Sequence, residues 1–559
     1  MHSGFPWVTV IAVIPLIGAV AIMALPKARE AQAKVIALVA SLVAMVGSII
    51  MAFAYNTNGD RYQFTQDYTW IKAFGAHYAV GVDGIGLALI LMTTVLAPIC
   101  ILASWHDADA PAGSDVPSGA ESAPAPSAGS GRGPRLFFIL LLATETLVVG
   151  VFGALDVFLF YVLFEAMLIP MYFLIGSFGG ARRSYAAVKF LLYSLAGGLL
   201  MLVAVIALYI VSVHQLGTGT FDYRVLSSDI ASGKLTISHS EQVALFLGFF
   251  IAFAIKAPLW PFHTWLPDAA AEAPTGTAVL LVGVLDKVGT FGFLRLCIPL
   301  FPYAAKTLAP WILVLCVIGI LYGALVAIGQ KDLKRLVAYS SVSHFGFIAL
   351  GVFAFTTQGG SGATLYMVNH GFSTGALFLV LGFMATRRGS RKVDDFGGVA
   401  SVAPWLGAMT LIAGLSALAL PGLSTFVSEF LVLVGTFTVH RWFAVVATFG
   451  IILAAVYVLW MIQRTIHGPV APAVAGFKDL SLRETWIIAP VMAVIVALGV
   501  YPKPILDIIN PSVEQTNSVV RPEGDPKPPV PENSATNSAG PCYDAAYVPP
   551  SCVRTGSAQ

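Results

Sequence analysis

Apolar runs of about 20 residues recur along most of the chain, and they constrain its fold more than any other feature. A helix of about 20 residues crosses the roughly 30 Å of hydrocarbon in a bilayer. The chain contains 57% hydrophobic and only 11% charged residues, whereas soluble domains carry about 25% charged residues. So many long runs cannot share one buried core. The sequence therefore predicts an all-α polytopic membrane protein.

We expect about 14 transmembrane helices, each recognised as an apolar stretch long enough to span the bilayer. Their ranges are 5–26, 35–55, 80–104, 135–153, 156–178, 185–213, 241–262, 275–297, 309–329, 335–355, 361–386, 401–440, 442–466 and 485–503. The 401–440 stretch contains Pro421-Gly422, and we interpret it as one interrupted span. The first run lacks a basic flank and a small-residue cleavage site, so we expect it to be retained rather than cleaved as a signal peptide.

The basic residues of the loops predict the orientation of these helices. With this count the loops alternate between two sides, and most Lys and Arg residues fall on one side, for example Arg182, Lys331 and Arg464. The positive-inside rule makes this side cytoplasmic and places both termini outside. Counting 401–440 as two spans would move the basic loop 464–483 outside, which fits the rule less well.

Two segments do not have the composition of a membrane span. Residues 106–134 are rich in Ala, Pro, Gly and Ser and should form a disordered cytoplasmic linker. Residues 511–559 are polar and Pro-rich and should form a disordered external tail. Cys542 and Cys552 lie in this tail, where oxidation is allowed, and we expect them to form a disulfide. Cys100, Cys297 and Cys316 lie in or beside apolar spans and should behave as small hydrophobic residues.

Several ionisable residues lie inside the predicted spans. They are Glu145, Glu165, Lys256, Lys287, His344, His370 and Glu429. A charge at the bilayer centre costs about 2.5–3.5 kcal/mol on insertion scales, so such residues usually pair with one another and mark a functional pathway. Glu165 and Lys256 are natural partners, although a purely structural ion pair is an alternative. Asp286 could neutralise Lys287 locally, and His344 could be an ordinary hydrogen-bonded core residue.

Two helix breaks accompany these charges, "KAPLWP" (256–261) and "LPGLS" (420–424). Proline removes a backbone donor, and broken helices are tolerated at membrane depth only where protein or water covers them. Breaks at corresponding places in two halves of a chain point to a transport pathway. The offset between the breaks predicts two inverted five-helix units, 135–297 and 309–466. Helices 1–3 (1–105) precede them, and a last helix (485–503) follows.

A lysine beside unwound backbone can serve as a switchable proton carrier. Burial disfavours the charged form of Lys256, and a nearby carboxylate such as Glu165 favours it. A change in their separation would load or release a proton, and the unwound segment would admit the water along which protons move. The sequence has no cysteine cluster with iron–sulfur spacing, no haem-type histidine pairing, no phosphate-binding glycine motif and no basic patch for nucleic acid. We therefore expect no cofactor or metal in this chain.

Long segments around these residues resemble a known family. They are "GVDGIGLALILMTTVL" (81–96), "LFYVLFEAMLIPMYFLIG" (159–176), "IKAPLWPFHTWLPDAAAEAPT" (255–275), "GQKDLKRLVAYSSVSHFGF" (329–347) and "LPGLSTFVSEF" (420–430). The chain resembles the antiporter-like proton-pumping subunits of respiratory complex I, NADH-quinone oxidoreductase, over residues 1–505. The segments "AEAPT" and "NHGFSTGALF" (369–378), together with Glu429, favour the subunit M family over its sisters L and N.

The resemblance implies roles for individual residues. Glu165 and Lys256 would gate protonation, and Lys287 would be the central relay. His344 and His263 would be bridging groups.

Glu429 would be the terminal group of the proton path. Glu145, an ionisable residue within an apolar span, is a further candidate site residue. Asp286 departs from the family pattern, where an apolar residue is usual, and this leaves the resting charge of Lys287 open. The resemblance also implies that FMN, the iron–sulfur clusters and quinone belong to partner subunits. The expected setting is a bacterial inner membrane, beside the sister subunits L and N.

Three other functions share some of these features. A subunit of a multisubunit cation/proton antiporter or of a membrane-bound hydrogenase would carry the same motifs. A stand-alone solute transporter would need no partner proteins. If the chain is a purely structural membrane scaffold, neutralising Glu165 or Lys256 should leave activity intact.

Overall fold

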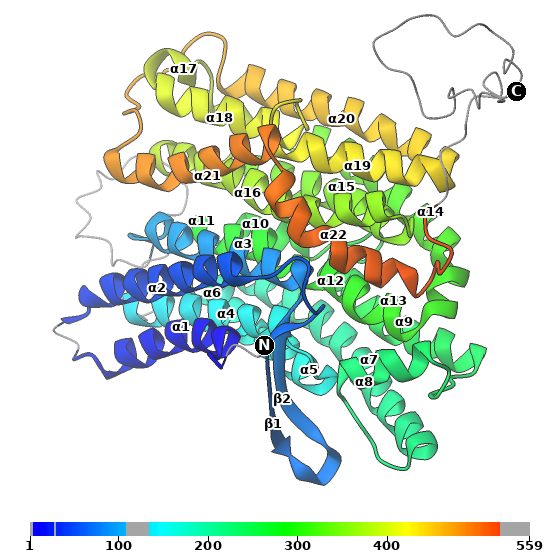
Figure 1. The fold of residues 1–559 in the computed structure, drawn as a ribbon. Coiled ribbons are helices and arrows are strands. Elements are labelled where there is room, and N and C mark those ends of the chain that lie inside the picture. The colour runs from blue at the N-terminus through cyan, green and yellow to red at the C-terminus, as the bar shows by residue number, and fades with distance from the viewer. Residues whose placement is uncertain (1–3, 27–28, 108–132, 526–559) are drawn as a thin grey trace, which may run out of the picture. The chain divides into compact units, whose positions relative to one another are not determined.

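The computed structural model describes residues 4–26, 29–107 and 133–525 of the chain (Figure 1). Most of the predicted linker 106–134 and the predicted tail from residue 526 onward lie outside the described residues. Cys542 and Cys552, with the disulfide expected between them, lie there as well. Cys100, Cys297 and Cys316 are buried free thiols, as their apolar surroundings predicted.

Helices make up most of the described chain. Their bounds are α1 (Trp7–Ala24), α2 (Gln32–Ala54), α3 (Gly84–Ala103), α4 (Pro134–Gly153), α5 (Val157–Ala166), α6 (Leu168–Phe178), α7 (Arg183–Leu216), α8 (Tyr223–Ala231), α9 (His239–Lys256), α10 (Leu266–Glu272), α11 (Thr275–Leu280), α12 (Lys287–Gly292), α13 (Ile298–Leu300), α14 (Pro302–Ile328), α15 (Leu333–Phe353), α16 (Thr357–Arg388), α17 (Val399–Val402), α18 (Pro404–Ala417), α19 (Ser424–Val439), α20 (Arg441–Thr465), α21 (Leu482–Val500) and α22 (Lys503–Ser518). Two π-helical turns, Leu281–Leu285 and Phe293–Cys297, join α11, α12 and α13 into one span.

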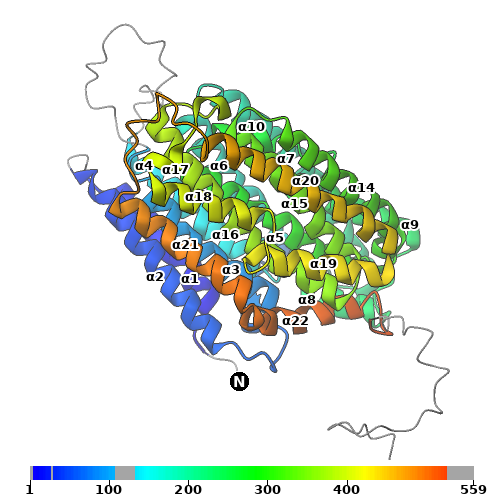
Figure 2. The ribbon, with the colours of Figure 1, turned by 90° about the horizontal axis from the view of Figure 1, so that it is seen from above.

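The count of membrane spans agrees with the prediction. Thirteen helical segments of the described chain are long and apolar enough to cross a bilayer, or fourteen if one strongly bent pair is counted as a span. The spans run side by side, and Figures 1 and 2 show α14, α15 and α20 as neighbours. The chain is therefore a mostly helical, multi-pass membrane protein. Its division into two inverted five-helix units remains a prediction.

Both predicted helix breaks are present. Helix α9 ends at Lys256, and the chain turns through residues 257–265 before α10 begins. The indole nitrogen of Trp265 donates a hydrogen bond of 2.9 Å to the Ile255 carbonyl, so protein covers part of the unwound backbone. The second break separates α18 from α19, and Gly422 adopts a positive φ of 91° there. Glycine is favoured at this position because it has no Cβ to clash in that conformation.

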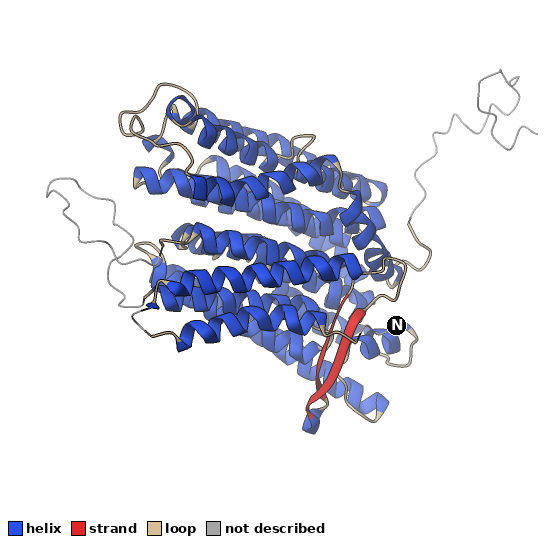
Figure 3. Ribbon diagram, turned by 60° about the vertical axis from the view of Figure 1, so that its left-hand side comes forward, coloured by secondary structure: helices blue, strands red, loops and turns tan. Residues whose placement is uncertain are grey.

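A two-stranded hairpin, β1 (Gln63–Ile71) and β2 (Ala76–Val82), lies at one end of the bundle and was not predicted (Figure 3). The strands are antiparallel, with Tyr68 opposite Tyr78. Gly75 provides the positive φ of 64° that the connecting turn requires. The predicted span 80–104 therefore begins as a strand, and its helix starts at Gly84.

The predicted boundary of the C-terminal tail was wrong. Helix α22 continues through Pro511 to Ser518, where a disordered tail from residue 511 was expected. Its buried side chains include Ile509 and Val513, four residues apart on one face, and the helix packs against α3 and α16. The polar and Pro-rich average composition of this region concealed the narrow apolar face that holds the helix in place.

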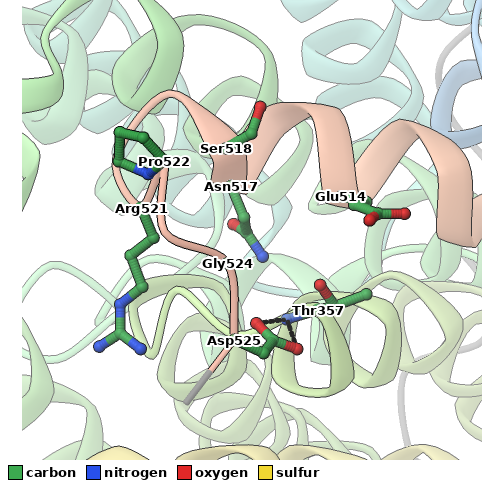
Figure 4. A pocket seen from close by; sticks show the side chains of 8 residues that line it. All are labelled: Thr357, Glu514, Asn517, Ser518, Arg521, Pro522, Gly524 and Asp525. Carbon is green, nitrogen blue, oxygen red and sulfur yellow. Dashed lines mark hydrogen bonds between the residues drawn. The ribbon is translucent and has the colours of Figure 1, made fainter. Parts of the chain in front are cut away.

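A polar pocket with a volume of about 270 Å³ lies between the end of α22 and the start of α16 (Figure 4). The Asp525 carboxylate accepts hydrogen bonds from the Thr357 backbone N–H at 2.9 and 3.1 Å. This contact satisfies an otherwise free donor in the first turn of α16. Residues 519–525 are thereby held against the start of α16.

Candidate functional site

Ionisable side chains from six separate helices lie in a buried succession through the molecule. They are Glu165 on α5, Lys256 on α9, Asp286 and Lys287 at the start of α12, His370 on α16, His344 on α15 and Glu429 on α19. All are buried except Glu165, which is half-buried. Such residues are rare in membrane helices and costly to bury there, which makes their succession the candidate functional site.

Lys256 is placed by the end of its helix. It is 1% exposed, and its Nζ lies 5.4 Å from the ring centroids of both Phe164 and Phe190. It interacts electrostatically with Glu165. Within the described part of the chain, however, Lys256 Nζ has no hydrogen-bond partner and forms no ion pair. The Lys256 amine and the Glu165 carboxylate therefore lie near each other without forming an ion pair. A change in the distance between them would alter the protonation of both groups.

Two consecutive glycines on α7 allow this arrangement. A Cβ added at Gly198 would lie 1.5 Å from the Glu165 carboxylate oxygen Oε1, and one added at Gly197 would lie 2.9 Å from Ile255 Cδ1. Any larger residue at Gly198 would displace the carboxylate. The Gly-Gly pair therefore leaves room against α7 for both the Glu165 carboxylate of α5 and the Ile255 side chain at the end of α9.

Lys287 is the most closely bonded member of the succession. Its Nζ donates a hydrogen bond of 2.5 Å to the Val282 carbonyl, which lies in the π-helical turn, and is 2.6 Å from His370 Nδ1. It also lies 5.0 Å from the ring centroid of Phe345. π-Helical turns recur at functional sites because they alter the hydrogen bonding and direction of a helix. A short Lys–His contact of this kind can pass a proton directly.

Histidine and tyrosine side chains continue the path toward α19. The rings of His370 and His344 are 5.2 Å apart between centroids. His344 Nε2 is 3.4 Å from the Tyr457 hydroxyl, and its ring lies 5.8 Å from that of Tyr366. The Tyr366 hydroxyl donates a hydrogen bond of 3.1 Å to Glu429 Oε2. Aromatic hydroxyls thus surround the route from the histidines to the terminal carboxylate.

The second helix break positions Glu429. The Asn369 amide on α16 donates hydrogen bonds to the Ser424 carbonyl at 2.6 Å and the Ser428 hydroxyl at 3.2 Å. The Thr425 hydroxyl donates to the Ser416 carbonyl across the break. These contacts fix the first turns of α19 against α16 and α18, and they place the Glu429 carboxylate beside Tyr366.

Two of the predicted site residues are not part of this succession. Glu145 is buried on α4, and neither of its carboxylate oxygens has a hydrogen-bond partner in the described chain. The His263 ring lies 5.0 Å from that of Tyr322 and 6.3 Å from that of Tyr339. Among residues 4–26, 29–107 and 133–525, neither His263 nitrogen has a hydrogen-bond partner, and no direct contact joins His263 to Lys256 or Lys287 there.

An ion-pair cluster follows the first break. Asp268 on α10 accepts hydrogen bonds from Lys189 at 2.8 Å and Arg335 at 2.6 Å. Burial opposes ionisation of this carboxyl group, but the two cationic donors hold the pKa of Asp268 below its usual range. The cluster joins α10, which follows the turn after Lys256, to α7 and α15.

Sequence reasoning gave some residues of the site no role. His370 was recognised as an ionisable residue within a span but received no role, yet its Nδ1 lies 2.6 Å from Lys287 Nζ. Tyr366 lies four residues before His370 on the same face of α16, and this spacing is the signal that could have found it. Tyr457 carries no such signal, because it comes from the distant helix α20. Among the described residues, no group of three or more His, Cys, Asp or Glu side chains could hold a metal ion.

The fold and the buried succession together define a polytopic helical membrane protein whose interior holds titratable side chains. Residues 154–454 match the family model for NADH:quinone oxidoreductase/Mrp antiporter transmembrane proteins. The chain belongs to this family.

Relatives over the full length support the assignment. NADH-quinone oxidoreductase subunit M of Mycobacterium tuberculosis is 51% identical over 554 residues, covering 96% of this chain and 99% of the relative. Subunit M of Rhodobacter capsulatus is 39% identical, covering 90% and 95%.

Solved structures share the fold. A chain of respiratory complex I from Thermus thermophilus superposes with a TM-score of 0.80 at 30% identity, covering 92% of this chain and 99% of that one. A chain of the Mrp complex from Dietzia has a TM-score of 0.75 at 18% identity, covering 93% and 98%, and shows the fold alone.

Proposed function

We propose that this chain is the proton-translocating subunit M of an NADH-quinone oxidoreductase. The observation that carries the proposal is the 51% identity to a curated subunit M over nearly the whole of both chains. The buried succession from Glu165 to Glu429 supplies the chemistry, since each member can bind and release a proton. The chain itself performs no redox step.

The succession suggests the order of proton transfer. Glu165 and Lys256 respond to each other's charge, so movement of one changes the proton affinity of the other. Lys287 passes a proton to His370 across their 2.6 Å contact. His344 and the two tyrosine hydroxyls bridge toward Glu429, which releases the proton at the far end. The same groups could also carry a proton in the opposite direction, from Glu429 toward Glu165.

Quinone reduction by NADH in other subunits would drive these steps. FMN, iron–sulfur clusters and quinone would be held by those subunits and would supply the redox energy. This chain's own residues would respond only to electrostatic and conformational changes passed along the membrane.

Glu165 suggests where a sister subunit docks. The Glu165 side chain is half-buried, with its Oε1 buried against Gly198 of α7. Ile169, on the next helix α6, is 59% exposed. We infer that a neighbouring subunit of the L or N type covers this apolar surface beside Glu165. The assembly would lie in a bacterial inner membrane with both termini of this chain outside.

Purification of the chain with its natural partners tests the proposal. An affinity tag on the chain should isolate a complex that contains flavin and iron–sulfur proteins and oxidises NADH with a quinone acceptor. Recovery of a flavin-free assembly with Na⁺/H⁺ exchange activity would instead show a multisubunit antiporter. Hydrogenase subunits in place of the flavoprotein would show a membrane-bound hydrogenase.

A further inference from the structure

Asp286 is a buried carboxylate with no assigned role. It is 0% exposed, and neither of its oxygens has a hydrogen-bond partner in the described chain. Burying a polar group without a partner is costly, and burying a charge is more so. Its retention beside Lys287 therefore requires an explanation.

The packing of α12 against α9 shows which way Asp286 faces. A Cβ added at Gly289 would lie 2.5 Å from the Phe253 carbonyl oxygen and 2.6 Å from the Ala257 nitrogen, so this face of α12 touches the end of α9. Asp286 lies three residues before Gly289 and shares its face. Lys256 is the last residue of α9 and immediately precedes Ala257. Asp286 consequently faces the end of the helix that carries Lys256.

Lys287 points elsewhere. Neighbouring residues on a helix are turned by about 100° from each other, because a turn contains 3.6 residues. The Lys287 amine reaches His370 on α16, while Asp286 interacts electrostatically with both Lys256 and Lys287. Asp286 and Lys287 thus lie between the end of α9 and His370.

We propose that Asp286 is a proton relay between Lys256 and Lys287, an additional catalytic residue of the pathway. In the first step the Lys256 ammonium loses a proton to the Asp286 carboxylate, giving a neutral amine and a carboxylic acid. In the second step the acid gives that proton to the neutral Lys287 amine, and the carboxylate is restored. No other reactant is needed.

The separation of the groups makes the first transfer a gated step. Asp286 forms no ion pair with Lys256 among the described residues, so the Lys256 side chain must swing toward it or a water must bridge the gap. The four-carbon stem of lysine provides this reach. The inference rests on the proposed function, since it assigns a step within the same pathway.

Infrared difference spectroscopy combined with pumping assays tests the relay. In purified complex that carries Asp286→Asn, we expect NADH-driven proton pumping to fall about tenfold, which corresponds to about 1.4 kcal/mol of barrier. Asp286→Glu should restore most of it. A protonated-carboxyl band that appears during turnover in the unmodified complex should be absent from the Asp286→Asn variant. The exposed Asp60→Asn variant is the matched control and should behave as the unmodified complex does.

Two results would overturn the relay. Unchanged pumping by assembled Asp286→Asn complex would show that the carboxylate carries no proton. Reduced pumping with an unchanged infrared band would show that Asp286 is a fixed counter-ion. Lys256→Ala and Lys287→Ala variants separate this inference from the proposed function: if they pump normally, the whole pathway fails, and if they fail while Asp286→Asn pumps normally, only the relay is wrong.

Discussion

Replacement of Lys287 by alanine is expected to reduce NADH-driven proton pumping by at least about tenfold, a barrier increase of about 1.4 kcal/mol. The reason is geometric, since Lys287 Nζ makes the 2.6 Å contact to His370 and the 2.5 Å contact to the Val282 carbonyl. Alanine removes both contacts and leaves His370 without the amine that it contacts. Proton uptake by inverted membrane vesicles, measured together with NADH oxidation, checks this expectation.

The control for this variant is Lys306→Ala, because Lys306 is exposed on α14. The Lys306 variant should pump normally. Native gel analysis must show that both variants assemble. Full pumping by assembled Lys287→Ala complex would remove Lys287 from the pathway.

A second large effect is expected at Glu429. We predict that pumping decreases in the order Glu, Lys, Ala at this position, with the alanine variant lower than the unmodified complex by about tenfold or more. Burial disfavours the charged carboxylate, and the hydrogen bond from Tyr366 partly compensates. A lysine could still carry a proton there, whereas alanine has no titratable group.

The three Glu429 forms are compared in assembled complex, by the rate of proton uptake at equal NADH oxidation. Glu523→Ala is a suitable control, since this glutamate is exposed beyond α22. Equal pumping by the lysine and alanine variants would show that no titratable group is needed at this position. The outlet would then have to be sought at His344.

The membrane spans and both helix breaks were predictable because their causes are local. An apolar run of sufficient length has few alternatives to a membrane helix, and proline interrupts a helix wherever it occurs inside one. The breaks at Lys256 and at Pro421 therefore lie where the sequence predicted them. The buried positions of Lys287, His344 and Glu429 followed from the same apolar runs.

Other features depend on contacts that sequence reasoning could not see. The contact between Lys287 and His370 joins residues 83 positions apart, and only the packing of α12 against α16 creates it. Helix α22 is held by a narrow apolar face against α3 and α16, so its average composition misled the prediction. The ring of His263 lies 5.0 Å from that of Tyr322 on α14, a contact that sequence reasoning could not foresee, and its role as a bridging group stays a prediction.

The central claim is that the buried charges conduct protons rather than merely hold helices together. Proton uptake by inverted vesicles that carry Glu165→Gln or Lys256→Ala tests it most directly, because these two residues begin the pathway. We expect both variants to assemble, to pump protons at about one tenth of the normal rate or less, and to oxidise NADH correspondingly slowly. Normal pumping by either assembled variant would contradict the account.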